Sequence, residues 1–199
     1  MKTKALAEEI LRQLSGNNPV ASGFGTDIRE VISAIHQASS ALVKKDYYMK
    51  LNLLGERGIS ESWLQTYKNI PILTDETLGL RYSNLPARVM TLPDDKGVYV
   101  VAPQEDYDNP FVPQGFGKRF IFGNLPILHP VYWVDVDKVY YKNVPSAVKE
   151  VMMVLVPQVL EEIQDDVAFE VRDAVIKMYM STKPIPKDET NDNNNNTQP

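Results

Sequence analysis

Two Leu-Pro pairs restrict the middle of this 199-residue chain more than any other feature. Leu85-Pro86 and Leu92-Pro93 bracket one segment, because proline lacks a backbone donor and forces the residue before it into extended geometry. A turn sequence follows at 94–97, with a glycine that can adopt positive φ, and the apolar residues 98–101 read as a returning strand. We therefore predict a rigid β-hairpin over 85–101. Its structural residues are Leu85, Pro86, Leu92, Pro93 and Gly97.

Helical patterns precede this segment. Leucine and isoleucine recur at helical spacing over Thr3–Leu14, which predicts a short amphipathic helix. The longest helix is expected from residue 28 to about residue 48, because Asp27 is a good N-cap and Glu30 lies three residues later, as in a capping box. A further short helix is expected over 61–67, capped by the preceding serine.

From about residue 70 the pattern favours strands. Prolines and glycines recur through 103–130, which predicts a long loop of a kind that is usually functional or ordered by a partner. Short β-branched and aromatic runs lie on both sides of this loop and within it. Strands are expected over 70–74, 78–82, 119–122, 131–134 and 138–141. The last two should form a second hairpin, with residues 135–137 as its turn.

The last third of the chain ends in a helix and a polar tail. Residues 149–156 suit a strand, although they could equally begin a helix. After an acidic loop over 161–166, a helix is expected over 167–180, with Asp165 or Asp166 as its N-cap. The tail from residue 187 is rich in Asp and Asn and has no apolar residue to bury, so we expect it to be disordered.

These patterns predict an α+β fold with long proline-rich loops. The expected organisation is an N-terminal helical region (1–69), a β-rich region (70–160), a C-terminal helix (161–182) that packs back on the helical region, and a disordered tail (183–199).

Composition excludes several classes of protein. Without cysteine there is neither a disulfide framework nor thiolate chemistry. A net charge of −5 argues against a dedicated nucleic-acid binder, which would normally present a basic face. The N-terminus carries acidic residues where a signal peptide needs an apolar core, and no run reaches the roughly 18 apolar residues of a membrane span. We expect a cytoplasmic protein, at least during synthesis, that has no membrane partner.

No residue pattern indicates a catalytic, cofactor or metal site, and none is predicted. His36 and His129 lie far apart in the sequence, without metal-ligand spacing around them, and are interpreted as structural. An acidic cluster precedes the last helix and is interpreted as solvated and helix-capping. Its members are Glu161, Glu162, Asp165 and Asp166.

The glycine-rich residues 115–119 do not form a phosphate-binding loop. Position 112 is valine where a Walker loop needs glycine, and no Ser or Thr follows the lysine. We interpret this stretch as a flexible, locally basic loop that could meet a partner or a DNA backbone. The possible interface residues are Phe111, Phe116, Lys118, Arg119 and Phe120.

Five stretches in this order carry a family resemblance. They are residues 80–86 (Leu-Arg-Tyr-Ser-Asn-Leu-Pro), residues 92–98 (Leu-Pro-Asp-Asp-Lys-Gly-Val), Tyr132-Trp133, the helical pattern 166–179 and the polar tail. Together with the N-terminal helices, they resemble the head–tail connector (adaptor or ring) proteins of tailed bacteriophages, most closely those of crAss-like phages of gut Bacteroidales. The resemblance covers roughly residues 1–190, and the β-rich middle goes beyond the helical bundle of a connector.

The resemblance implies a virion structural protein of the phage neck. Such proteins form closed rings of about twelve copies between the portal and the next neck or tail ring, through a heterologous interface. The N-terminal helices would pack around the ring, the last helix and tail would reach the portal, and the β-region loops would meet the next ring. Genomic double-stranded DNA would pass through the lumen, where a charge of −5 per chain, about −60 for twelve copies, would repel phosphate.

Two alternatives remain open at the level of sequence. The chain could be a non-virion protein-interaction or scaffolding module without catalysis. It could also be a small enzyme with an unrecognised site in the loop 103–130.

Overall fold

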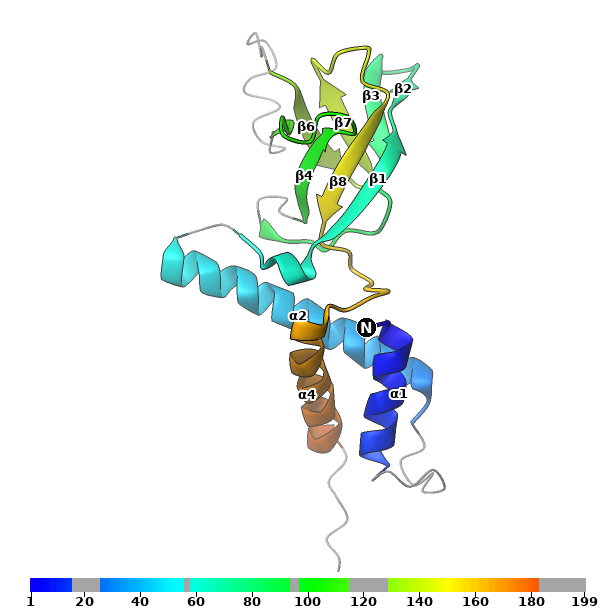
Figure 1. Ribbon diagram of the computed structural model, residues 1–199, viewed down its shortest axis with the longest axis vertical. Coiled ribbons are helices and arrows are strands. Elements are labelled where there is room, and N and C mark those ends of the chain that lie inside the picture. The colour runs from blue at the N-terminus through cyan, green and yellow to red at the C-terminus, as the bar shows by residue number, and fades with distance from the viewer. Residues whose placement is uncertain (16–25, 56–57, 94–96, 115–128, 183–199) are drawn as a thin grey trace, which may run out of the picture.

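The structure, a computed structural model, describes residues 1–15, 26–55, 58–93, 97–114 and 129–182. It has the expected α+β fold, and its elements form two parts (Figure 1). The helical part contains α1 (Thr3–Leu14), α2 (Ile28–Leu54) and α4 (Asp165–Thr182). The β part holds all the named strands and stands on the helical part, with α2 lying crosswise nearest to it (Figure 1). The predicted disordered tail lies outside the described residues.

The first two helices begin where the sequence predicts. α1 has the expected bounds and buries one face, and Asp27 caps α2 by accepting a hydrogen bond from the Arg29 amide at 3.1 Å. α2 extends beyond the predicted end near residue 48, because helical residues continue until Gly55. There the backbone takes φ +67° and the Gly55 amide donates to the Leu51 carbonyl at 3.1 Å.

The predicted helix over 61–67 is wrong. Only the 3₁₀ turn η2 (Glu61–Trp63) forms, and the chain continues as strand β1 (Gln65–Pro71), which pairs with β8 (Glu150–Leu155). Ser60 does not cap η2 with its side chain. Its amide and hydroxyl instead donate to the Asp46 carboxylate at 2.7 and 3.0 Å, which fastens this connection to α2.

Two sheets make up the β part. The three-stranded sheet has the order β1-β8-β4 and is antiparallel, with β4 at Val98–Pro103. Residues 149–156 therefore contain a strand, and the helical alternative is wrong. The five-stranded sheet has the order β2-β3-β7-β6-β5, with β5 parallel to β6 and the other pairs antiparallel. Its strands are β2 (Leu73–Asp75), β3 (Leu80–Asn84), β5 (Val112–Pro113), β6 (Val131–Asp135) and β7 (Lys138–Lys142).

The predicted strand over 70–74 is divided between these two sheets. β1 ends at Pro71 and β2 begins at Leu73, so the chain passes from one sheet to the other at Ile72. The Ile72 amide donates to the Lys149 carbonyl at 2.8 Å. The hairpin of β6 and β7 forms as expected, whereas the predicted strand 119–122 lies outside the described residues.

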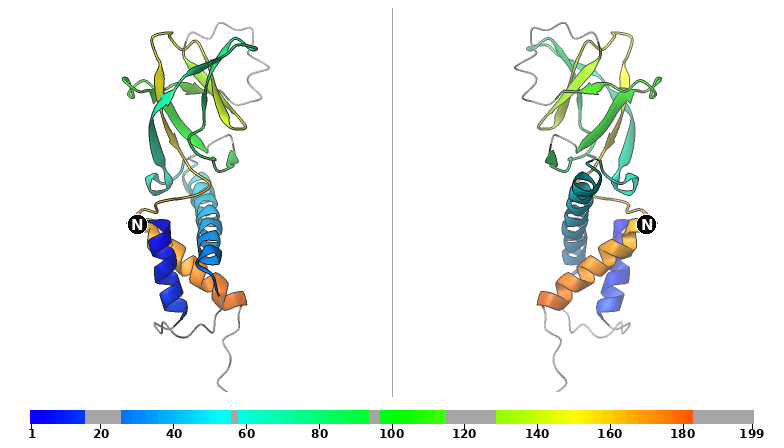
Figure 2. Two further views of the ribbon diagram at one scale, coloured as in Figure 1. Left: turned by 90° about the vertical axis from the view of Figure 1, so that its right-hand side faces the viewer. Right: turned by 90° about the vertical axis from the view of Figure 1, so that its left-hand side faces the viewer.

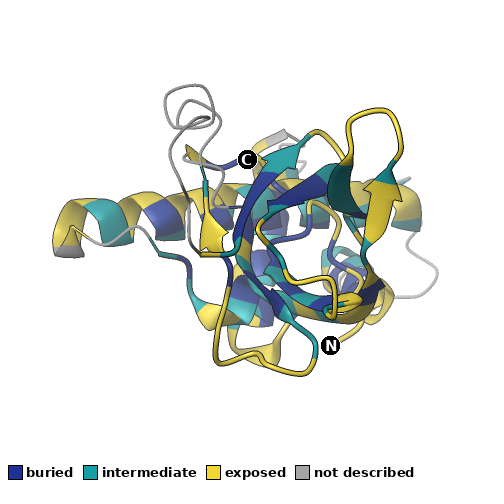
Figure 3. Cartoon of the chain, turned by 90° about the horizontal axis from the view of Figure 1, so that it is seen from above, coloured by how far each residue is buried: buried dark blue, intermediate teal, exposed yellow. Residues whose placement is uncertain are grey.

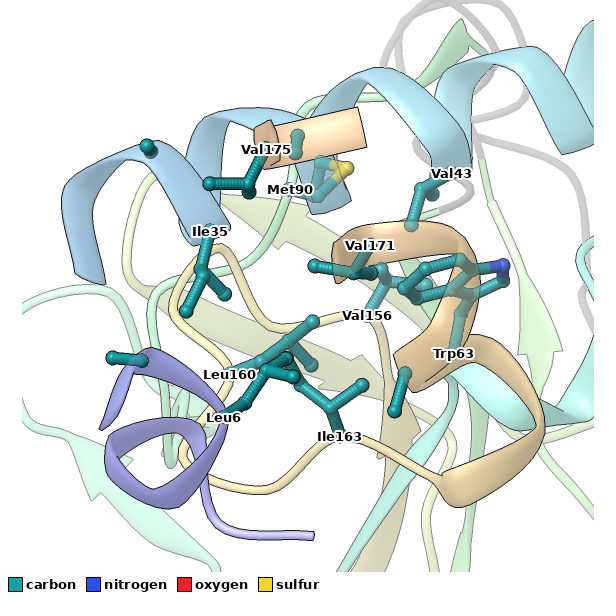
Figure 4. Close-up of a cluster of buried hydrophobic side chains, with 14 of the residues drawn as sticks. Leu6, Ile35, Val43, Trp63, Met90, Val156, Leu160, Ile163, Val171 and Val175 are labelled. Atoms are coloured by element: carbon teal, nitrogen blue, oxygen red, sulfur yellow. The ribbon is translucent and has the colours of Figure 1, made fainter. Parts of the chain in front are cut away.

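Each part has a core of its own. Residues of both sheets and Phe111 meet in the β core, which includes Ile70, Val98, Val101, Phe111, Tyr132, Val139, Tyr141, Val151, Met153 and Leu155. The helical core joins side chains of the three helices to residues of the connecting segments (Figure 4). Its buried members include Leu6, Ile35, Val43, Trp63, Met90, Val156, Leu160, Ile163, Val171 and Val175.

The hairpin predicted over 85–101 does not form. β4 pairs with β8, and the segment before it pairs with the chain that leaves β8. The Met90 amide donates to the Val156 carbonyl at 2.9 Å, and the Gln158 amide donates to the Arg88 carbonyl at 2.7 Å. We call the paired segments 88–90 and 156–158 the seam. The local turn sequence at 94–97 predicts a hairpin, but the strand that follows it, β4, pairs with β8, which is distant in the sequence.

Side chains alternate at the seam, as they do along any extended segment. Val89 packs against the β core, whereas Met90 is buried in the helical core. Across the seam, Leu155 belongs to the β core and Val156 belongs to the helical core. The same short stretch of backbone therefore supplies side chains to both cores.

The last helix closes the helical part. α4 begins at Asp165, two residues before the prediction, so Asp165 and Asp166 lie in its first turn. Arg172 pairs with Glu9 of α1 at 2.8 Å, and the Thr3 amide donates to the Glu161 carbonyl at 3.0 Å just before α4. α1 and α4 both start near the N-terminus and run away from the β part, diverging toward their ends (Figure 2).

Gly97 provides a test of the seam. Its φ is not positive; a side chain is excluded because a Cβ atom would lie 2.2 Å from the Met90 carbonyl oxygen and 2.4 Å from Val89 Cγ1. We expect Gly97→Ala to lower the free energy of unfolding by about 2 kcal/mol in urea denaturation, and Gly97→Val to lower it further. Gly58→Ala is the control, because a Cβ there meets no atom within 4 Å. Equal stability of the two alanine variants would contradict this role.

Val136 is strained at the tip of the β6–β7 hairpin. This β-branched residue has φ +54° and is 91% exposed, so it gains no packing in return for its left-handed conformation. We expect Val136→Asn to raise the free energy of unfolding by about 1 kcal/mol, since asparagine tolerates this conformation. Val159→Asn, at an exposed position without positive φ, should give no such gain. A loss of stability in Val136→Asn would show that the valine is not strained.

Candidate interaction surface

The side chains that could catalyse a reaction or bind a metal do not cluster in the described part of the chain. Among those residues, no group of three or more His, Asp or Glu side chains could hold a metal ion. The acidic cluster Glu161, Glu162, Asp165 and Asp166 is exposed. None of the described helices is long and apolar enough to cross a membrane.

His36 is half-buried in α2. Its Nδ1 atom is buried and finds no hydrogen-bond partner among the described residues. Burial lowers the pKa of this imidazole below its ordinary value, because a charged ring would lose its hydration.

The structure places one of the possible interface residues in the β core. Phe111 is buried, its amide donates to the Val101 carbonyl at 2.8 Å, and its ring lies 5.8 Å from that of Tyr141 in an edge-to-face arrangement. Its side chain therefore contributes to packing. The other four residues, Phe116, Lys118, Arg119 and Phe120, lie outside the described residues.

The residues assigned to the predicted hairpin lie along the connection to the seam. Leu85 packs against the β core, and Leu92 is buried in the helical core. Pro86 and Pro93 are exposed, and Gly97 is buried against Met90. These residues therefore contribute to packing along the connection between the two cores.

The last turns of α2 expose large apolar side chains. Tyr48, Met49 and Leu53 are 49%, 48% and 76% exposed, and Figure 3 shows exposed residues at the end of this helix, which projects beyond the rest of the helical part. Lys44 and Lys45, also exposed, lie one turn before Tyr48 and Met49 and two turns before Leu53. Two stripes at i, i+4 spacing result, one of Lys44, Tyr48 and Asn52 and one of Lys45, Met49 and Leu53. We call these six residues the α2 tip.

The opposite face of α2 at this level is well packed. Val43 and Tyr47 are fully buried, and Asp46 binds Ser60. The exposed residues of the α2 tip are thus held on a rigid helix. Met49 and Leu53 lie beyond the predicted end of this helix near residue 48. The i, i+4 repeat that continues up to Gly55 is the sequence signal that indicates them.

A hollow of about 560 Å³ lies between residues 62–67 and 161–165. Glu161, Glu162 and Asp165 line it, so we call it the acidic hollow. Tyr67 also lines the hollow, and its hydroxyl donates a hydrogen bond to Gln65 Oε1 at 2.9 Å. Burial, and secondly the nearby Glu161 carboxylate, raise the pKa of Tyr67.

Another pocket, of about 570 Å³, opens in the β part. Phe111 and three prolines contribute to its lining, and charged side chains such as Lys149 and Glu150 lie at its edge. Arg81 holds the adjacent loop by donating to the Val144 and Pro145 carbonyls at 3.0 and 2.8 Å. Among the described residues, its lining includes neither histidine nor serine.

No protein-family model matches this chain, and no curated protein matches its sequence.

The lowered pKa of His36 has a consequence for stability. Below about pH 6.5 the unfolded chain binds a proton on this side chain that the folded chain binds less readily, so the free energy of unfolding falls as pH falls. The slope from this residue is at most about 1.4 kcal/mol per pH unit. We expect urea denaturation between pH 7.5 and 5.5 to show a shallower decline for His36→Gln than for the wild type. An unchanged decline would show that His36 does not cause it.

Proposed function

We propose that this chain is a structural protein of the neck of a tailed bacteriophage. In this proposal it forms a homo-oligomeric ring, of about twelve copies, between the portal and the adjacent neck or tail ring. The ring conducts and retains the genomic DNA without binding it specifically, and it becomes part of the virion after assembly in the host cytoplasm. No catalysis and no cofactor are part of this function.

The α2 tip is the observation that carries the proposal. Tyr48, Met49 and Leu53 are exposed together on a helix that buries Val43 and Tyr47 on its other face. Aromatic residues and methionine are enriched where proteins associate, whereas isolated exposed apolar residues need no explanation. Several large apolar side chains exposed near one helix end favour assembly with another protein over chemistry in a cavity.

Charge supports the same proposal. The net charge of −5 gives each copy a potential that repels phosphate, which suits a channel through which DNA must slide. A protein that gripped DNA would need a basic face to bind the backbone. The sequence resemblance adds the specific setting, the phage neck.

A non-virion scaffolding module would use the same surface for a different partner, so location separates the two functions. We expect the chain to be present in purified particles in a fixed ratio to the portal protein. We also expect mass photometry and negative-stain images to show closed rings, either of the chain alone or of the chain mixed with portal. Its absence from particles, together with monomers in both samples, would contradict the neck function.

A further inference from the structure

We propose that the α2 tip of one copy docks into the acidic hollow of the next copy. This inference rests on the proposed ring, because a closed ring needs two different surfaces that fit one another. It identifies both surfaces, and therefore the residues that hold neighbouring copies together.

The α2 tip is basic as well as apolar. Its six residues carry the two positive charges of Lys44 and Lys45 and no negative charge. Asp46 lies in the same stretch of helix, but its carboxylate is turned to Ser60, from which it accepts two hydrogen bonds. The exposed face thus presents lysines one turn before Tyr48 and Met49 and two turns before Leu53.

The acidic hollow has the complementary charge. Asp165 pairs with the amino group of Met1 at 3.1 Å, whereas no ion pair among the described residues involves Glu161 or Glu162. Both glutamates are exposed at the hollow. Leu64 and Tyr67, both partly exposed, add apolar surface to its lining. Its volume of about 560 Å³ is within the range of small-molecule pockets, so the hollow is large enough to admit side chains of a partner.

The α2 tip and the acidic hollow face different directions, so the tip of one copy cannot enter the hollow of the same copy. The buried face of α2 packs into the helical core with Trp63, whose neighbours Ser62 and Leu64 line the hollow (Figure 4). The α2 tip points away from that core. In both views of Figure 2 the N-terminus, one wall of the hollow, lies on the opposite side from α2. Repetition of the contact therefore joins copies in series, and the series closes into a ring if the rotation allows.

The charged residues and the apolar residues have different roles in the proposed contact. Charged residues at the edge of an interface mainly set the association rate and its salt dependence, whereas buried apolar anchors mainly set the dissociation rate. The lysines and glutamates would steer the tip into the hollow, and Tyr48, Met49 and Leu53 would hold it there. Higher salt should accordingly weaken the association of copies.

Charge reversal tests this pairing in the full-length chain. We expect Lys44→Glu with Lys45→Glu, and separately Glu161→Lys with Glu162→Lys, to weaken self-association by about tenfold or more in sedimentation velocity. Each double variant has one intact surface, so an equimolar mixture pairs reversed tip with reversed hollow and intact tip with intact hollow. The mixture, and the variant with all four changes, should recover most of the wild-type association.

Two controls separate a lost contact from a lost fold. Lys149→Glu reverses an exposed lysine that belongs to neither surface, and it should leave association unchanged. Leu53→Ser should weaken association without lowering the unfolding temperature, because this side chain is 76% exposed.

Several results would overturn the inference. If neither charge reversal weakened self-association, the proposed ring would stand, but its interface would be formed by other residues. Failure of the mixture to recover, with both variants folded, would show that the two surfaces do not meet each other. Wild-type chains that stay monomeric with and without portal, and are absent from particles, would overturn both this contact and the proposed neck function.

Discussion

The pairing of residues 88–90 with residues 156–158 holds the two cores of this protein together. Its hydrogen bonds satisfy the Met90 and Gln158 amides, and its alternating side chains enter the β core on one side and the helical core on the other. Since packed interiors tolerate little change in volume, the cores are coupled through this backbone. The close contact between Gly97 and Met90 belongs to the same arrangement, because β4 must begin directly against the seam.

The coupling of the two cores matters for the proposed function because it fixes the positions of the two proposed contact surfaces. The α2 tip belongs to a helix whose Val43 is buried in the same core as Trp63, and Ser62 and Leu64, the sequence neighbours of Trp63, line the acidic hollow. The direction of each surface is therefore set by buried residues and not by a flexible linker. In the proposed ring, the angle between neighbouring copies would follow from how α2 sits in the helical core.

Local signals in the sequence predicted the elements that depend on local interactions. The Asp27 cap, the apolar stripe of α1 and the β6–β7 hairpin were all predictable, because caps, helical spacing and short turns involve neighbouring residues. The seam was not predictable in this way. Prolines and a turn sequence indicated a hairpin at 85–101, whereas the true partners are residues 156–158, far along the chain.

The same limit applies to β1 and to the candidate site. Residues 65–67 resemble the continuation of a helix until β8 pairs with them, and tertiary pairing overrides weak helical propensity. Lys44, Lys45 and Tyr48 lay in the predicted helix, but their exposure depends on which face the core covers. The acidic cluster was visible in the sequence, whereas the hollow that it lines exists only because residues 62–67 fold beside it.

The length of α2 has a mechanical consequence. With 27 residues at 1.5 Å each, this helix is a rod about 40 Å long. Its first half is fixed by buried residues such as Val31 and Ile35, while its far end projects with Leu53 exposed. A load applied by any partner at that end acts through a lever on the helical core and, through the seam, on the β part. The force that this protein can carry is then limited by the packing of its interior and not by the strength of the contact alone.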